Sequence, residues 1–282
     1  MISAGGLLRF VFSALVLIGL APVSFLAGGV TGVIARCTDE LPEIPELAKY
    51  RPKIVTTCYA DGGTIIGVFY KQKRFVVALD RIPFHVLHAF IAAEDRRFFD
   101  HYGIDWQGIA RAVYKNVMAF KFQQGASTIT QQVARHVLLT NDKRISRKIK
   151  EMLLARKIEQ LWGKQKILFV YLNEIYLGDQ CYGIEAAARN YFDKHVTELS
   201  IAEAALLAGI VPSPSKYNPF KNRHMSLVKQ RLVLGNMLTC GAITKEEYEK
   251  ALREKLQFQS KADRPFDIVP DFTEAVRRYV IN

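Results

Sequence analysis

The sequence predicts a mainly α-helical domain, preceded by a small β element and by one N-terminal transmembrane helix. Three observations support this fold class. Beyond residue 80, apolar residues recur at helical spacing, and capping residues stand where the runs begin. Two β-rich stretches flank a turn just before this part, and a long uncharged stretch lies near the N-terminus. A chain of 282 residues is long enough to bury a sizeable core.

The uncharged stretch covers residues 10–35. Its 26 positions exceed the roughly 20 apolar residues that a helix needs to cross a bilayer, so we expect a retained transmembrane helix. A cleaved secretory signal, with a shorter apolar core and a small-residue cleavage site, is the alternative. The charges on either side favour residues 1–9 as a cytoplasmic stub, with the body of the protein outside.

Residues 36–79 are predicted to form a juxtamembrane linker followed by a β-hairpin. Three X-Pro pairs in the linker favour extended backbone. The β-rich stretches 54–60 and 64–70 flank Asp61-Gly62-Gly63, which is a turn sequence, and residues 74–79 are a candidate for another strand.

Residues 80–257 are predicted to form one mainly α domain, and residues 258–282 a C-terminal tail with an amphipathic piece at 272–280. Three pairs are typical of helix starts: Thr128 with Gln131, Ser200 with Glu203, and Thr244 with Glu247. Glycines are expected to end helices at Gly163, Gly178 and Gly241. The expected helices cover 80–95, 105–118, 127–139, 146–162, 164–177, 182–191, 200–209, 223–240 and 245–256.

The formal net charge of +12 favours anionic partners. The sequence contains no recognisable nucleic-acid module, so anionic lipids and lipid diphosphates are better candidates than DNA. A DNA-binding protein is the alternative, and it predicts salt-sensitive binding. The four cysteines are scattered without a C-x-x-C pair, which argues against a zinc site, and nothing selects a disulfide pairing: they are Cys37, Cys58, Cys181 and Cys240.

Two glutamates are predicted to lie on apolar helix faces. In the helix expected at 80–95, Glu94 falls within the apolar stripe while Asp95 falls outside it. In the helix expected at 146–162, Glu151 points into the middle of the apolar side. A charge in such a place is costly unless it is paired or functional, and burial raises a carboxyl pKa, which suits a general base. A structural ion pair is the alternative for each.

Five segments that include these glutamates resemble the motifs of peptidoglycan glycosyltransferases. Residues 94–103 read E-D-R-R-F-F-D-H-Y-G and resemble the family motif E-D-x-x-F-x-x-H-x-G. Four further segments resemble the second to fifth motifs and stand in the family's order: residues 125–132 (G-A-S-T-I-T-Q-Q), 147–151 (R-K-I-K-E), 166–178 and 229–237. Together the motifs cover roughly residues 80–240.

The resemblance implies a lysozyme-like, two-lobed glycosyltransferase domain with a membrane-proximal cleft. The implied reaction polymerises lipid II into β-1,4-linked glycan with inversion and release of the polyprenyl diphosphate, in bacterial cell wall synthesis. The implied location is the inner membrane, crossed once, with the catalytic domain on the periplasmic side. Lipid II, the growing lipid-linked glycan and the membrane are the implied partners, other cell-wall synthesis proteins are further candidates, and no nucleic acid is expected.

The same resemblance assigns roles to particular residues. Glu94 is the implied general base for the acceptor's sugar 4-hydroxyl, and Glu151 lies near the donor diphosphate, where it orients groups or helps to hold a divalent ion. No tightly bound cofactor is implied, and Mg²⁺ or Mn²⁺ at the diphosphate is the candidate ion. The implied substrate-binding residues are Ser127, Thr128, Gln132, Arg135, Lys143, Arg147 and Lys148.

Several features depart from the family pattern or leave alternatives open. Phe169 replaces a common Glu and is expected to pack in the core, and Gln230 interrupts a basic pair in the fifth motif. Asn173 and Tyr176 are expected to be structural. Ser213-Pro214-Ser215-Lys216 spells S-x-x-K, but it lies in a Pro-rich loop and no K-T-G follows, so no transpeptidase is expected. A glycan-cleaving enzyme and a non-catalytic scaffold are the rival functions.

Overall fold

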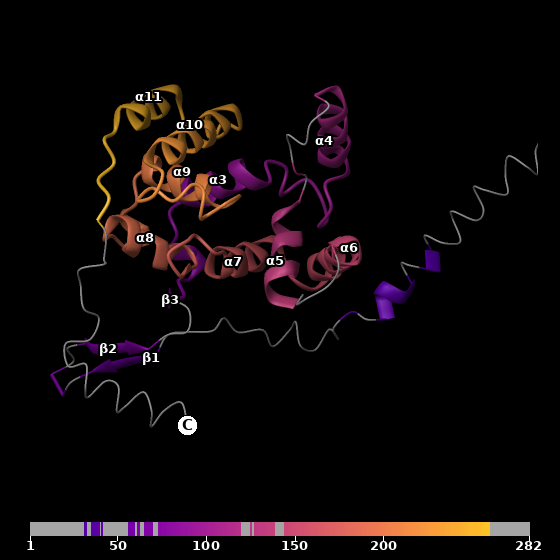
Figure 1. Ribbon diagram of the computed structural model, residues 1–282, viewed down its shortest axis with the longest axis horizontal. Helices are drawn as coiled ribbons and strands as arrows, with labels where there is room; N and C mark the ends of the chain where they lie inside the picture. Colours follow the sequence, from indigo (N-terminus) through magenta and orange to yellow (C-terminus); the bar gives the residue numbers. More distant parts are fainter. Residues whose placement is uncertain are drawn as a thin grey trace, which may run out of the picture.

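The computed structural model describes residues 31–32, 35–39, 41, 56–59, 61–62, 65–69, 73–119, 125, 127–138 and 144–259. In this part the protein is mainly helical, as predicted (Figure 1). The described elements beyond residue 50 are β1 (Thr56–Tyr59), β2 (Ile65–Phe69), β3 (Lys73–Arg74), the 3-10 turn Leu79–Arg81, α3 (Phe84–Glu94), α4 (Trp106–Met118), α5 (Ile129–Leu138), α6 (Arg144–Leu161), α7 (Lys164–Glu174), β4 (Cys181–Tyr182), α8 (Ile184–Phe192), the 3-10 turn Val196–Glu198, α9 (Ile201–Ile210), α10 (Arg223–Thr239) and α11 (Lys245–Arg253).

The predicted transmembrane helix at 10–35 lies almost entirely outside the described residues. Within the described residues, no helix combines the length and the apolar character that crossing a membrane requires. The amphipathic piece predicted at 272–280 also lies outside the described part.

Helices α3, α9, α10 and α11 pack together as one helical group around α9 (Figure 1). Nine of the ten residues of α9 are buried, as expected for a helix that is apolar on all sides. The predicted capping box is present at its start, where Ser200 and Glu203 bond each other's backbone N–H. A second capping box, Thr244 with Glu247, starts α11.

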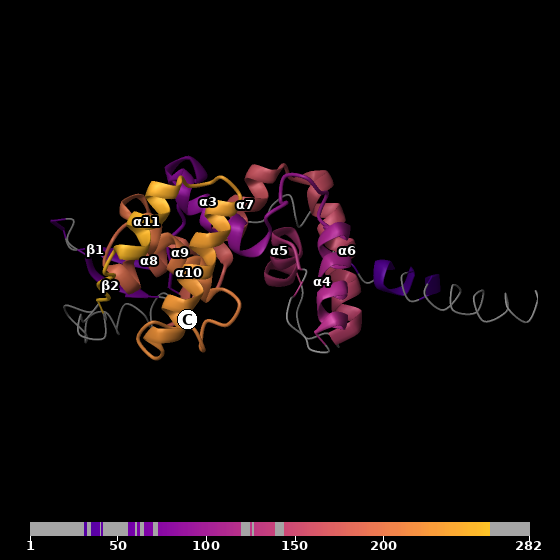
Figure 2. The ribbon, with the colours of Figure 1, turned by 90° about the horizontal axis from the view of Figure 1, so that it is seen from above.

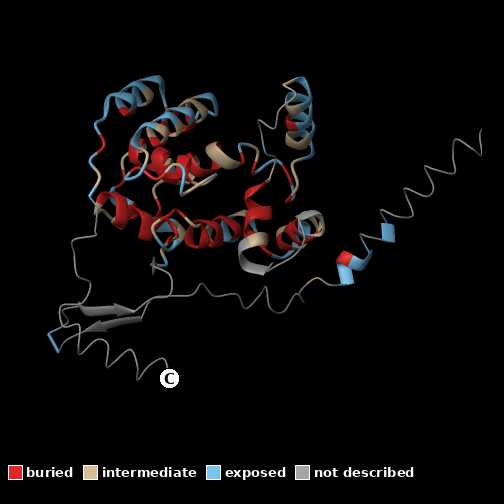
Figure 3. Ribbon diagram, in the orientation of Figure 1, coloured by how far each residue is buried: buried red, intermediate tan, exposed pale blue. Residues whose placement is uncertain are grey.

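Helices α5 and α6 pack on each other and on α7, and α7 continues toward α8 (Figure 1). The helices thus form two packed groups, and α7 contacts members of the second group and α8. Figure 3 shows that α7 to α9 are largely buried, whereas α4 is mostly exposed. Helix α4 stands apart in Figure 1, and Ala112 is its one buried residue. Figure 2 shows the same groups from above, with α3, α8, α9, α10 and α11 at one end of the helical body and α4 and α6 at the other.

The β elements confirm the hairpin and correct the region after α7. Strands β1 and β2 pair antiparallel, as predicted. The short β3 pairs with β4, which the sequence analysis placed at the start of a helix. The two helices expected at 164–177 and 182–191 instead end at Glu174 and begin at Ile184. The backbone explains this, because Gly178 and Gly183 have φ angles of 90° and 84°, which interrupt helical geometry.

Two structural predictions in this region are confirmed. Asn173 is fully buried, and its side chain accepts from the Val77 N–H at 2.9 Å and donates to the Val77 carbonyl at 3.0 Å. These bonds tie the segment after β3 to α7. Phe169 packs partly buried against the core, as expected.

The loop between α3 and α4 docks tightly on α6 through Gly103. This glycine has a φ of 82°, and a Cβ added to it would lie 2.7 Å from the Ala155 carbonyl oxygen. Its own carbonyl accepts from the Thr128 hydroxyl at 2.7 Å. Only glycine therefore allows the loop after Glu94 to pack against the helix that carries Glu151.

We expect Gly103→Ala to lower the free energy of unfolding by about 1–3 kcal/mol, because a side chain would be forced into a left-handed conformation against backbone. The measurement is denaturant unfolding of the purified protein in detergent.

The matched control is Gly235→Ala in α10, where an added Cβ meets no atom within 4 Å. This change should be neutral or raise stability by about 0.5–1 kcal/mol, since alanine favours helix interiors. Equal effects of the two changes would contradict the close packing at Gly103.

Candidate active site

Glu94 is the last residue of α3, where the helix opens into a pocket. Its side chain is half-buried, and its Oε2 accepts a hydrogen bond from Gln132 Nε2 at 2.7 Å. No ion pair to Glu94 exists within the described part of the chain. Burial raises the pKa of Glu94, the nearby charge of Asp95 raises it further, and the bond from Gln132 and the charges of Arg135 and Lys229 oppose this effect. Glu94 thus combines a raised pKa with a position at a pocket.

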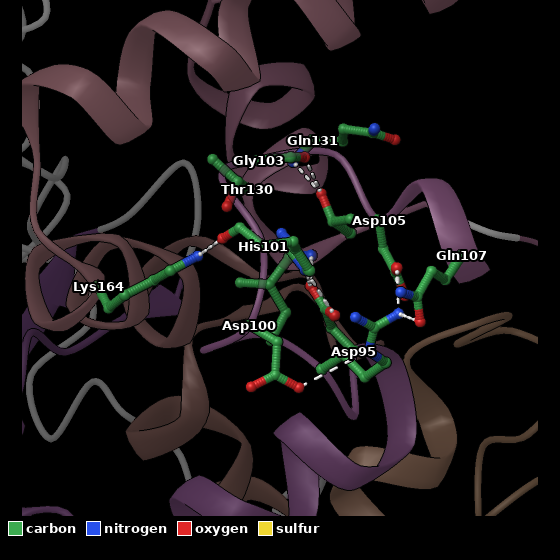
Figure 4. Close-up of polar contacts among 12 residues, drawn as sticks. Asp95, Asp100, His101, Gly103, Asp105, Gln107, Thr130, Gln131 and Lys164 are labelled. Carbon is green, nitrogen blue, oxygen red and sulfur yellow. Dashed lines mark hydrogen bonds and ion pairs between the residues drawn. The ribbon is translucent and has the colours of Figure 1, made fainter. Parts of the chain in front are cut away.

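Asp95 is buried, which corrects the prediction that it lies off the apolar face. The reason is that α3 ends at Glu94, so the backbone turns and directs Asp95 inward. Both of its oxygens lie 3.0 Å from His101 Nε2, and one accepts from the Ile129 N–H at 3.1 Å (Figure 4). Ile129 is the first residue of α5, so Asp95 satisfies a donor that a helix start leaves free.

Asp95 and His101 were not among the predicted site residues. Both are in the first motif, so the motif itself was the available signal. The predicted helix ran to residue 95, one residue beyond the observed end of α3, so the helical spacing gave the wrong direction for the Asp95 side chain.

Helix α5 connects the two glutamates. Gln132 donates to Glu94, and Arg135 Nε donates to Glu151 Oε1 at 2.9 Å. Residues three apart share one face of a helix, so a single face of α5 bonds both carboxylates. The structure therefore brings together residues that are 57 positions apart in the sequence.

Glu151 lies at the centre of a basic cluster. Its side chain is only 2% exposed, whereas those of Arg135, Arg147 and Lys148 are 38%, 44% and 44% exposed. Arg147 Nε lies 3.5 Å and Lys148 Nζ 3.3 Å from its oxygens. For Glu151 the structure thus shows the ion-paired alternative, and the three cations present their outer sides to solvent.

Lys148 links this cluster to the start of α5. Its Nζ donates to Ser127 Oγ at 2.8 Å, to Gln131 Oε1 at 2.9 Å and to Glu151. Burial lowers the pKa of Lys148, and the neighbouring Glu151 charge opposes this shift. Ser127 is thereby held at the rim between the cluster and the pocket.

The pocket beside Glu94 has a volume of about 450 Å³. Its walls come from the end of α3, from α4, from the segment before α5 and from α10. The lining residues are Ala93, Glu94, Asp95, Arg96, Arg97, Asp105, Gly108, Arg111, Lys115, Gly125, Ser127, Thr128, Leu232 and Asn236.

Two cations on α4 face this pocket and were missed in the sequence analysis. Arg111 and Lys115 are one helical turn apart, and in the sequence they look like ordinary solvated charges. Arg97 also lines the pocket, but it bonds Asp105 at 3.0 Å and Gln107 at 2.6 Å, which offsets its charge (Figure 4). The pocket therefore places Glu94 beside a wall that carries Arg111 and Lys115.

Thr128 and Lys143 differ from the other predicted substrate-binding residues. Thr128 is buried, and its hydroxyl already donates to the Gly103 carbonyl and accepts from the Gln131 N–H at 3.2 Å, which is the predicted helix cap. Lys143 lies outside the described residues, so its role stays a prediction.

A protein-held metal site does not fit the residues around Glu151. Its two oxygens already accept from Arg135 and Lys148, and three cations surround it. In the described part of the chain, no group of three or more His, Cys, Asp or Glu could hold an ion.

The part of the chain that contains this site matches a known protein family. The family described as Transglycosylase matches residues 62–238, which is more than half of the chain. The chain belongs to the transglycosylase family. Glu94, Glu151 and the residues of α5 all lie within the matched part of this transglycosylase.

Relatives of this transglycosylase include penicillin-binding protein 1A of Neisseria flavescens, 47% identical over 220 residues, which are 78% of this chain and 28% of that protein. Penicillin-binding protein 1A of Aquifex aeolicus (strain VF5) is 46% identical over 242 residues, which are 86% and 33% of the two chains. The chain thus spans about a third of the length of these relatives. A crystal structure of penicillin-binding protein 1A from Haemophilus influenzae aligns with a TM-score of 0.47 and 27% identity, over 82% of this chain and 25% of that one.

The raised pKa of Glu94 predicts a pH-dependent stability effect. The folded state binds the Glu94 proton more tightly than the unfolded state, so this residue costs stability as pH rises from the ordinary value of 4.5 through the raised pKa. Glu94→Gln removes this cost and can keep a bond to Gln132. We expect the variant to melt at a higher temperature than wild type at pH 7 to 8, with the difference shrinking below pH 4.5.

Thermal unfolding across this pH range tests the prediction. Glu249→Gln is the control, since the Glu249 side chain is 49% exposed. If the Glu94→Gln variant were less stable than wild type at every pH, burial of the charged Glu94 would not cost the folded state stability.

Proposed function

We propose that this transglycosylase is a peptidoglycan glycosyltransferase that joins lipid II to a growing lipid-linked glycan through β-1,4 bonds. One observation carries the proposal: two carboxylates bonded by one face of α5 have opposite environments. Glu94 faces a pocket and has no ion pair among the described residues, whereas Glu151 is buried among three cations. The membership of the transglycosylase family supports the same reaction class.

Glu94 acts as the general base in this proposal. The acceptor's 4-hydroxyl oxygen attacks C1 of the donor sugar while its proton moves to the Glu94 carboxylate. Gln132 holds Oε2, so the carboxylate keeps a fixed direction, and no side chain of the described residues bonds Oε1. Because burial raises the pKa of Glu94, its basicity is better matched to reaction near neutral pH.

The basic cluster stabilises the leaving diphosphate. As the new bond to C1 forms, the bond from C1 to the diphosphate oxygen breaks, and both bonding electrons leave with that oxygen. Arg135, Arg147 and Lys148 are fixed on their inner sides by Glu151 and exposed on their outer sides, so they can meet the charge that develops. Arginine can grip a phosphate with two parallel bonds. Attack from the face opposite the diphosphate inverts C1.

The cluster also argues against a glycan-cleaving enzyme. Glycoside hydrolases of the common type use two carboxyl groups, one on each side of the bond. Here the second carboxylate is neutralised by cations, which suits an anionic leaving group rather than an alcohol that needs a proton. Release of sugars from finished glycan would favour the hydrolase.

A membrane location for the catalytic domain is part of the proposal. Helix α4 exposes Trp106, Val113, Tyr114, Val117 and Met118, each more than half exposed. Trp106, Val113 and Val117 recur at helical spacing on one side, while Arg111 and Lys115 face the pocket. An apolar face with cations beside it is typical of a helix at a lipid surface. The single-pass anchor and its orientation, and contacts with other cell-wall synthesis proteins, belong to this proposal as well.

Polymerisation of lipid II by the purified protein in detergent tests the chemistry. Glu94→Gln should lower kcat by about 10²- to 10⁴-fold, the usual contribution of a general base. Glu151→Gln should reduce the rate less and weaken donor binding, because the cations lose the carboxylate that holds them. Glu249→Gln should retain wild-type activity. A folded Glu94→Gln variant with wild-type kcat would rule out the assigned base.

The two tryptophans provide a test of the membrane contact. Trp106 is 64% exposed and Trp162 is 2% exposed. In vesicles with brominated acyl chains, a Trp162→Phe variant should lose much of its fluorescence because Trp106 meets lipid. A Trp106→Phe variant, which retains the buried Trp162, should not. Equal quenching in both variants would contradict lipid contact by α4.

A further inference from the structure

Helix α10 supplies a side chain that caps the end of α3. The last carbonyls of a helix have no partner inside it. One of these carbonyls belongs to Ala92, and it accepts from Asn236 Nδ2 at 3.2 Å. The two residues are 144 positions apart, so this is a tertiary cap made by the fifth motif region on the helix that carries Glu94.

The same amide makes a second bond on the other side of Glu94. Asn236 Oδ1 accepts from the Arg96 guanidinium. Ala92 and Arg96 lie two residues before and two residues after Glu94, so one side chain holds both flanks of the turn. Its orientation is set by its partners, because a carbonyl can only accept and a guanidinium can only donate.

We propose that Asn236 is a positioning residue for Glu94, an inference that rests on Glu94 being the base in the proposed function. Helix ends fray, and Glu94 is the last residue of its helix. The adjacent Asp95 N–H donates to the Ile91 carbonyl at 2.9 Å, whereas the Ala92 carbonyl accepts from the Asn236 side chain. A displacement of about 1 Å can cost about 10²-fold in rate, so a fixed turn matters for proton transfer.

Only an amide of this length fits both bonds. Aspartate could accept from Arg96 but could not donate to the Ala92 carbonyl. Leucine has similar volume and makes neither bond. Asn236 also lines the pocket, so contact with substrate is the competing role. The two roles differ in kinetics: a positioning residue affects kcat, whereas a residue that only holds substrate affects KM.

The experiment compares steady-state lipid II polymerisation by the full chain carrying Asn236→Leu or Asn236→Asp. Asn236→Leu should lower kcat about 10- to 100-fold with KM within about twofold of wild type. Asn236→Asp adds a negative charge at the pocket, which disfavours ionised Glu94. The acid limb of its kcat/KM profile should therefore move to higher pH, together with a loss in kcat.

Two further variants separate positioning from general stability. Asn222 caps the start of the same helix by accepting from the Met225 N–H at 3.2 Å. This cap lies at the opposite end of α10 from Asn236. Asn222→Ala should lower the melting temperature but leave kcat unchanged. Arg96→Ala should lower kcat in wild type and lower it less in the Asn236→Leu background, since Asn236→Leu already removes the bond to Arg96.

The outcomes are distinct. A wild-type kcat in folded Asn236→Leu, or a rise in KM with unchanged kcat, overturns the positioning role while an inactive Glu94→Gln leaves the proposed function standing. A fully active Glu94→Gln removes the proposed function itself. If Asn236→Leu does not fold, the nearly isosteric Asn236→Asp carries the test, and an unchanged kcat and acid limb in that variant overturn the proposal.

Discussion

The buried carboxylate of Asp95 is the interaction on which the candidate site depends. It bonds His101 within its own loop and the first N–H of α5, so it joins the end of α3 to the start of the helix that carries Gln132 and Arg135. A carboxylate at a helix N-terminus is favoured by the helix dipole and by unpaired donors. Together with the bonds from Thr128 to Gly103 and from Gln132 to Glu94, it holds Glu94 against the face of α5 that reaches Glu151.

Burial separates the roles of the two glutamates. Glu151 is the more deeply buried, but three cations compensate it, and it functions as the anchor of a basic cluster. Burial raises the pKa of Glu94, because no cation among the described residues is in ion-pair contact with it to offset that burial. The same residue type thus has a raised pKa in one place and holds a group of cations in the other, and the difference comes from the neighbours.

The sequence predicted the helices, the hairpin and the two glutamates, because each leaves a local signal. Caps such as Ser200 with Glu203 act within four residues, and a carboxylate in an apolar stripe is visible from spacing alone. It could not predict the link between Asn236 and Ala92, the pairing of β3 with β4, or the pocket-facing side of Arg111 and Lys115. These depend on how distant segments pack, and a surface cation has the same local pattern whether or not it lines a pocket.

The adjacency of Glu94 and Asp95 couples the structure of the site to its chemistry. Asp95 accepts the first N–H of α5, and its charge raises the pKa of its neighbour Glu94. The backbone turn after Glu94 directs one carboxylate into the protein and leaves the other at the pocket. A single turn therefore sets the position of Glu94, through α5 and Asn236, and part of its pKa shift, through Asp95. Replacing Asp95 would change both properties together, whereas replacing Asn236 by an apolar residue would change position while leaving the Asp95 charge in place.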